Sequence, residues 1–254
     1  MSSDPKPGSA LELALIKKHE AEAAKFEAEA HLALTAAAEN EQETRRSILE
    51  ARDFGIDLRQ KERIERELLA LDSYNHVYRF NSSVDDSSVK AAIDKLTYWK
   101  RTDGADGPIE IEIIFNSPGG NVIAGMDLFD YIQELRREGH TIITSTRGMA
   151  ASMGGILLQA GTRRIMGREA YVLLHEVSTA AFGKIGEIED EVKFVRKISD
   201  RVLDIFAARC KQAGENGTAV APLTRAQLKS GWTRRDWWLD SEECLRAGLV
   251  DELR

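Results

Sequence analysis

Apolar and polar residues alternate in blocks along the last two-thirds of the chain. Short apolar runs that predict strands occur at residues 76–80, 109–115, 141–145, 164–166 and 171–174. Segments with an apolar residue every three or four positions, which predict helices, occur at residues 86–100, 122–135 and 185–212. Strands that alternate with helices predict an α/β fold of repeated βαβ units, with a parallel sheet and right-handed crossovers.

The C-terminal pattern after the long helix predicts smaller elements. Thr224 begins a short helix with the spacing of a capping box. Asp240 or Ser241 is placed to cap a last helix, and Leu249–Val250 predicts a final short strand.

The N-terminal third has a different pattern. Residues 11–71 consist mostly of Ala, Glu, Leu, Lys and Arg, which are strong helix formers. We expect Asp53–Ile56 to interrupt this helix and a second helical piece to follow. Residues 1–73 are therefore predicted to form a helical arm, and residues 74–254 a separate domain. The thin Ala-rich face of the arm suits either assembly or partner docking, or a solvated helix without further function.

Composition narrows the function classes. The chain has 254 residues, a formal net charge of -7 and two cysteines without metal-ligand spacing. The negative charge argues against nucleic-acid binding, and no apolar run is long enough to span a bilayer. We expect a soluble, cytoplasmic protein that binds neither nucleic acid nor membrane and needs no metal or cofactor.

A run of small residues encloses one hydroxyl group. Residues 148–155 read Gly-Met-Ala-Ala-Ser-Met-Gly-Gly, directly after the strand at 141–145. Glycine permits a sharp turn that holds Ser152 at a helix start, where free backbone N–H groups suit an oxyanion. The alternative is a tightly packed helix start with an incidental serine.

A second glycine turn follows the strand at 109–115. Gly119 and Gly120 lie between that strand and the next helix, so their backbone N–H groups can bind an anion or an oxyanion. An ordinary strand-to-helix turn is the alternative. The dinucleotide fingerprint and the Walker lysine are absent from the sequence, which excludes a nucleotide loop.

A nucleophilic serine needs a base and a group that orients the base. Of the five histidines, only His175 follows an apolar strand. Asp236 is flanked by Arg235 and by two tryptophans, which can bury it. The alternative is that His175 is an ordinary histidine at the end of a strand. Asp236 would then form a surface ion pair with Arg235. Spacing alone does not establish that Ser152, His175 and Asp236 meet.

From about Tyr74 to Leu253 the sequence resembles the Clp protease proteolytic subunit (ClpP), a serine peptidase family with a crotonase-like fold. The motifs that match are Asn116–Gly120, Ala124–Met126, Gly148–Gly154, Leu173–His175, Arg235–Asp236 and Ser241–Asp251. The resemblance implies Ser152 as nucleophile, His175 as general base and Asp236 as its orienting carboxylate. It also implies an oxyanion hole formed by the backbone N–H groups of Gly120 and Met153.

The resemblance further implies an assembly. The helix from Ile185 is similar to the family's handle, which interlocks two heptameric rings into a closed chamber. Unfolded proteins or peptides are the implied substrates, and an AAA+ unfoldase with ATP-dependent action is the implied partner.

Departures from the family pattern concern assembly more than chemistry. Glu176–Val177 stands where members usually have Gln-Pro, Ser178–Gly183 is poorer in glycine, and Arg234 replaces a common acidic residue. The arm before Tyr74 has no counterpart in ordinary members, and divergent phage and prophage forms act in capsid maturation. A crotonase-type acyl-CoA hydratase or hydrolase on the same core fold is a second hypothesis, and a non-catalytic ring component is a third.

Overall fold

The computed structural model describes residues 10–178 and 180–254. The polar stretch at residues 1–9 lies outside the described residues. The chain divides between Leu68 and Leu69 into two compact units, which are described separately.

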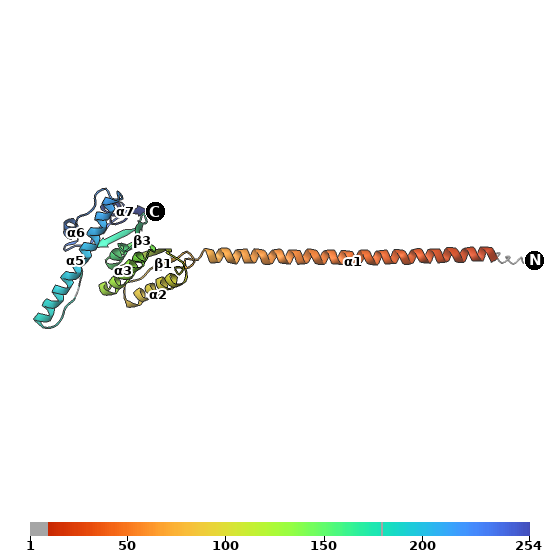
Figure 1. Ribbon diagram of the computed structural model, residues 1–254, viewed down its shortest axis with the longest axis horizontal. Coiled ribbons are helices and arrows are strands. Elements are labelled where there is room, and N and C mark those ends of the chain that lie inside the picture. The colour runs from red at the N-terminus through yellow and green to blue at the C-terminus, as the bar shows by residue number, and fades with distance from the viewer. Residues whose placement is uncertain (1–9, 179) are drawn as a thin grey trace, which may run out of the picture. The chain divides into compact units, whose positions relative to one another are not determined.

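The described part of the N-terminal unit lies in one helix, α1 (Ala10–Leu69), of 60 residues (Figure 1). Its side chains from residue 12 onward are exposed, apart from the partly buried Gly55. Ion pairs four residues apart support it, among them Arg45 with Glu41 at 2.9 Å and Arg63 with Glu67 at 2.8 Å. Across the part of the chain that is described, no helix combines the length and hydropathy that a bilayer crossing requires.

The predicted interruption of α1 at Asp53–Ile56 is wrong, because the helix runs through these residues without a break. One glycine in a helix interior costs only about 1 kcal/mol relative to alanine. The strong helix formers on both sides of Gly55 outweigh that cost.

The C-terminal unit contains a seven-stranded sheet and six helices among its described residues. The strands are β1 (Val77–Phe80), β2 (Glu110–Ser117), β3 (Thr141–Ala151), β4 (Arg163–Met166), β5 (Tyr171–Leu174), β6 (Trp237–Leu239) and β7 (Glu252–Leu253). The helices are α2 (Asp86–Thr102), α3 (Val122–Arg137), α4 (Met153–Leu158), α5 (Ile185–Glu215), α6 (Arg225–Trp232) and α7 (Ser241–Ala247). All strand pairs are parallel except β5 with β6, so the predicted α/β fold is confirmed.

The long strand β3 divides the sheet into two branches. Residues 143–146 pair with β4, whereas residues 149–151 pair with β5. The main path therefore runs β1-β2-β3-β4-β7, and β5 and β6 form a side branch. This branching places the end of β3, where α4 begins, next to the end of β5.

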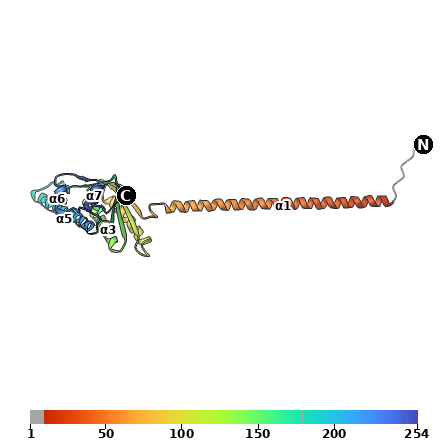
Figure 2. The same ribbon diagram turned by 90° about the horizontal axis from the view of Figure 1, so that it is seen from above.

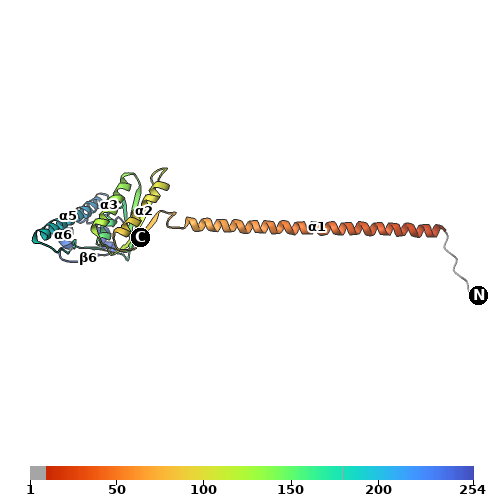
Figure 3. The same cartoon turned by 90° about the horizontal axis from the view of Figure 1, so that it is seen from below.

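Helices cover the sheet and enclose the core. Asp85 caps α2 through a capping box, and α2 packs beside α3, where Thr97 Oγ1 lies 2.6 Å from Tyr131 Oη (Figure 3). On the other side of the unit α6 packs against α5 (Figure 2). The buried residues of α5 begin at Val202, and the half of the helix before that point projects from the unit (Figure 1).

Two short strands at the C-terminus differ from the sequence-based prediction. Strand β6 was not predicted, because only its pairing with β5 makes three residues into a strand. The final strand is Glu252–Leu253 and not Leu249–Val250. The latter pair is buried but belongs to the turn after α7, since both its N–H groups donate to the Cys244 carbonyl.

A buried ion pair between Arg164 and Asp251 lies near the C-terminal end of α4. Arg164 is 1% exposed, and its guanidinium donates to both carboxylate oxygens of Asp251 and to the Gly248 carbonyl. Nearby, Arg136 donates to the Ala160 carbonyl at 2.9 Å and Arg209 to the Gly161 carbonyl at 2.8 Å. Arginines therefore hold the carbonyl groups that follow α4 and complement the negative end of its dipole.

Replacing Asp251 by Asn is expected to lower the free energy of unfolding of the C-terminal unit by about 3–5 kcal/mol, because Arg164 would keep a buried charge without its carboxylate. Urea unfolding followed by tryptophan fluorescence measures this loss, since all four tryptophans lie in this unit. The control is Glu252→Gln, which breaks the exposed 2.6 Å pair with Arg163 and should cost less than about 1 kcal/mol.

The same pair predicts an acid dependence. Burial would raise the pKa of Asp251, but the hydrogen bonds and charge of Arg164 outweigh burial and hold this pKa below its usual value. The contribution to stability is therefore present above the pKa of an unfolded aspartate and is lost as pH falls through the lower, folded pKa. Wild type should lose more stability than Asp251→Asn over that range, and parallel curves for the two proteins would contradict this role.

Candidate active site

Ser152 occupies a strained turn between strand and helix. It lies between the end of β3 and the start of α4, with φ 52° and ψ -120°, a left-handed conformation that is rare outside glycine. Its N–H donates to the Leu173 carbonyl at 2.9 Å, which ties the turn to β5. The hydroxyl makes no capping hydrogen bond to α4. A strained serine in such a turn, with its hydroxyl not used to cap the helix, is typical of a nucleophile.

Gly119 packs directly against this turn. Its φ is +91°, and a Cβ atom at this position would lie 2.6 Å from Ser152 Cβ and 2.9 Å from the Met153 nitrogen. Both the conformation and the space therefore require glycine. The two glycine-containing turns predicted from the sequence are in contact.

Beside Ser152, two backbone N–H groups have no acceptor among the residues that the structure describes. Met153 is the first residue of α4, so its N–H has no carbonyl partner within that helix. Gly120 forms an isolated parallel bridge in which Val84 bonds to Gly119 and Asn121, at 2.8 and 2.7 Å. In this pattern the middle residue directs its own N–H away from the partner strand.

His175 follows β5 and is partly buried. Its Nδ1 lies 2.6 Å from the Glu176 carbonyl oxygen, an acceptor that requires the proton to be on Nδ1. Nε2 is then unprotonated in the neutral ring and can accept a proton.

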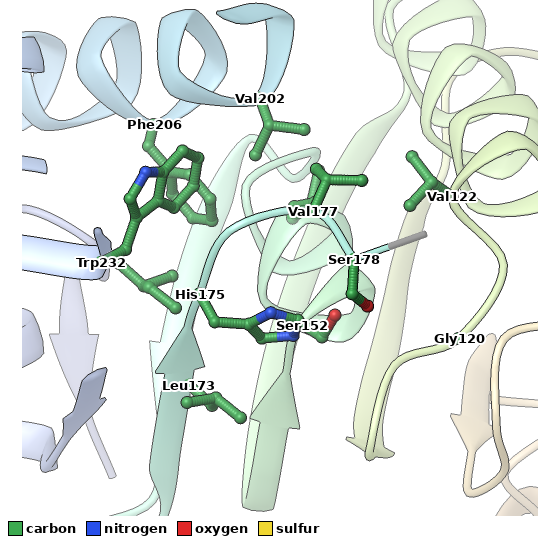
Figure 4. A pocket seen from close by; sticks show the side chains of 12 residues that line it. Gly120, Val122, Ser152, Leu173, His175, Val177, Ser178, Val202, Phe206 and Trp232 are labelled. Atoms are coloured by element: carbon green, nitrogen blue, oxygen red, sulfur yellow. The ribbon is translucent and has the colours of Figure 1, made fainter. Parts of the chain in front are cut away.

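Ser152 and His175 line one pocket, and both side chains reach into it (Figure 4). The cavity measures about 60 Å³, and Gly120 also lines it. Four helices contribute apolar side chains to the wall, namely Val122, Ile156, Val202, Phe206 and Trp232, and residues 173–175, 177 and 178 at and after the end of β5 complete it. The pocket thus lies beyond the ends of β3 and β5, where α/β folds place their sites.

Asp236 is exposed, and within the described residues it makes no hydrogen bond to His175 and does not line the pocket. The antiparallel pair of strands β5 and β6 nevertheless ends next to both His175 and Asp236. Leu173 pairs with Trp238 and Leu174 with Trp237, so the next pair in this register is His175 with Asp236. The ladder itself ends at Leu174 and Trp237, so His175 and Asp236 are the first residues beyond it on the two chains.

Sequence reasoning missed several residues of this site. Trp232 and Phe206 form part of the pocket wall, and the Glu176 carbonyl contacts the imidazole. The apolar periodicity of α5 marked Val202 as inward-facing, but it did not indicate which cavity the helix covers. In residues 10–178 and 180–254, no cluster of His, Cys, Asp or Glu side chains is arranged to hold a metal ion.

Known proteins resemble this chain over most of its length. A family model described as Clp protease matches residues 59–254. The chain belongs to the Clp protease family. The resemblance inferred from the motifs is confirmed, although the match begins at residue 59, within α1, and not at Tyr74.

Two relatives show the degree of similarity. The ATP-dependent Clp protease proteolytic subunit of Adiantum capillus-veneris is 32% identical over 195 residues, which cover 74% of this chain and 88% of the relative. The ATP-dependent Clp protease proteolytic subunit 2 of Tropheryma whipplei (strain Twist) is 35% identical over 153 residues, covering 59% of this chain and 77% of the relative. Family membership identifies the chain as a peptidase of the Clp type.

Replacing Gly119 by Ala is expected to reduce the reaction of Ser152 with a fluorophosphonate probe by about 10²-fold, because the added methyl would displace Ser152 and the neighbouring Met153 N–H. Rates of labelling, measured by mass spectrometry of the Ser152 peptide, test this. The matched control is Gly186→Ala, where a Cβ atom meets nothing within 4 Å. Equal labelling of the two variants would contradict the assigned role of Gly119.

Proposed function

We propose that the chain is a serine endopeptidase in which Ser152 is the nucleophile and His175 the general base. Asp236 orients the imidazole, and the N–H groups of Gly120 and Met153 form the oxyanion hole. The observation that carries this proposal is the strained Ser152 turn, which shares a pocket with His175 and has two free N–H donors beside it.

The proposed reaction has two steps. His175 Nε2 takes the Ser152 proton while Oγ attacks the carbonyl carbon of the peptide bond, and the carbonyl oxygen becomes negative between the two N–H donors. The intermediate collapses to an acyl-enzyme as the imidazolium gives its proton to the departing amine. Water, deprotonated by His175, then attacks the acyl carbon and releases the acid, which restores Ser152.

The orienting group has two components in this proposal. The Glu176 carbonyl accepts from Nδ1 in the resting geometry. The Asp236 carboxylate, opposite His175 by strand register, adds the negative charge that stabilises the imidazolium. An acyl-CoA reaction of the crotonase type would use the same two N–H donors but would leave Ser152 and His175 without a role.

The proposed enzyme is a ring. Proteins of this family form oligomeric rings that work with Clp ATPases. The projecting half of α5 and the segment before it expose apolar side chains, including Phe182 at 91% and Ile185 at 78%. We propose that these surfaces are buried in a heptameric single or double ring, whose chamber admits unfolded chains supplied by an AAA+ unfoldase in an ATP-dependent way.

The helical arm has a role in assembly or partner docking in this proposal. The predicted domain boundary separates an arm at residues 1–73 from a peptidase domain at residues 74–254. Apolar residues of α1 at alternating spacings of three and four, namely Ala23, Phe26, Ala30, Ala33 and Ala37, share one exposed face that suits packing against other helices in a coiled coil. We assign the arm to assembly or partner docking.

Ser152→Ala and His175→Ala are each expected to lower the hydrolysis of a fluorogenic peptide by at least about 10⁴-fold. Asp236→Ala should lose only about 10²-fold, less than the roughly 10⁴-fold loss typical of a triad aspartate, because the Glu176 carbonyl still holds Nδ1. The measurements are kcat/KM and the site of fluorophosphonate labelling.

Ser178→Ala provides the comparison for these variants, because Ser178 is the other serine that lines the pocket. It should still be labelled at Ser152. Labelling of Ser178 in the wild type, or peptide hydrolysis by Ser152→Ala, would rule out the proposed nucleophile.

Native mass spectrometry of the full chain is expected to give seven or fourteen subunits. Replacing Phe182 and Ile185 together by Ser should convert fourteen to seven or leave seven unchanged, because these side chains belong to the projecting region around the start of α5. A monomer for the wild-type chain at micromolar concentration would contradict the ring.

A further inference from the structure

Glu176 contacts His175 and also the segment that carries Asp236. Its backbone carbonyl lies 2.6 Å from His175 Nδ1. Its carboxylate accepts a hydrogen bond from the Arg234 N–H at 2.9 Å, two residues before Asp236. Sequence reasoning treated Glu176 only as a departure from the usual family residue.

The second contact extends the antiparallel strand pair. Strands β5 and β6 pair through Leu174 and Trp237, and the ladder ends there. His175 and Asp236 follow on the two chains, beyond the last paired residues. The Glu176 side chain then crosses from the end of β5 to the segment at 233–236 and joins the chains again on the far side of that pair.

The segment at 233–236 needs such a link. Arg234 has φ +58°, a left-handed conformation that a non-glycine residue keeps only when its surroundings hold it. Other hydrogen bonds of this segment run back to α6, from Thr233 to the Lys229 carbonyl and from Arg235 to the Gly231 carbonyl. Among the described residues, the Glu176 carboxylate makes the only side-chain hydrogen bond from this segment to the end of β5.

We propose that Glu176 is a positioning residue that holds the Asp236 segment opposite His175 and fixes the imidazole. Its carboxylate acts as an acceptor for the Arg234 N–H, and its carbonyl acts as an acceptor for Nδ1–H. The inference rests on the proposed function, since it assigns a task within the triad. A glutamine retains the required side-chain acceptor, whereas an apolar residue of similar length does not.

The test compares Glu176→Gln with Glu176→Met in the full-length protein. Glu176→Met is expected to lower kcat for a fluorogenic peptide about tenfold with KM changed less than twofold. Glu176→Gln should retain at least half of the wild-type kcat. The double variant Glu176→Met/Asp236→Ala should lose no more than Asp236→Ala alone, because both changes remove the same orientation of His175.

The matched control is Glu243→Met. The Glu243 carboxylate also accepts a backbone N–H, from Asp240 at 3.0 Å, but it does so at the start of α7. This variant should lower the thermal unfolding midpoint without lowering kcat. If Glu176→Met proves unfolded in thermal melts, Glu176→Ala takes its place, and the comparison with Glu176→Gln stands.

Three results would overturn the inference. They are a kcat for Glu176→Met within twofold of wild type, a Glu176→Gln loss as large as that of Met, and losses that add with Asp236→Ala. Fluorophosphonate labelling of wild-type Ser152 distinguishes a failure of the Glu176 role from a failure of the proposed peptidase function. Normal labelling with an unaffected Glu176→Met removes this inference alone, whereas absence of labelling in the wild type removes the proposed function with it.

Discussion

The left-handed backbone of Ser152 is the constraint on which the rest of the site depends. Such a conformation persists only where its surroundings over-determine it. Here the Leu173 carbonyl accepts a hydrogen bond from the Ser152 N–H. Gly119 packs against the turn at a distance that leaves no room for a side chain. At the opposite end of the helix, the carbonyl groups after α4 are held by the partly buried Arg136 and the buried Arg209. The branched sheet thus places the serine by fixing both ends of a six-residue helix.

Local signals in the sequence predicted most of the elements. Apolar periodicity and capping residues are short-range, so α2, α5 and the strands before them were predicted closely. The glycines at 119–120 and the small residues around Ser152 also indicated two tight turns with free N–H groups. Their mutual contact could be inferred only from the order of strands in a parallel sheet, where successive carboxyl ends lie at one edge.

Features that depend on long-range pairing were not predictable in the same way. Three residues at 237–239 carry no strand signal of their own, and only pairing with β5 makes them β6. That pairing ends at Leu174 and Trp237, so His175 and Asp236 are the residues that follow the ladder on its two chains, a relation that the sequence did not show. The role of Glu176 was missed for the same reason, since its partner Arg234 lies 58 residues away. The predicted break in α1 failed for a different reason. Gly55 is a local signal for a helix break, but the helix preference of the residues around it is stronger.

The exposure of α1 has a consequence for how the chain unfolds. Cooperative unfolding requires that parts of a chain share buried contacts, and α1 buries almost none of its side chains within the described chain. Because each unit is defined by its own internal contacts, we expect the helix and the C-terminal unit to unfold in separate transitions. Helix content measured by circular dichroism sums over both, whereas tryptophan fluorescence reports on the second alone. Association through α1 would raise the melting temperature of the first transition with protein concentration and leave the second where it was.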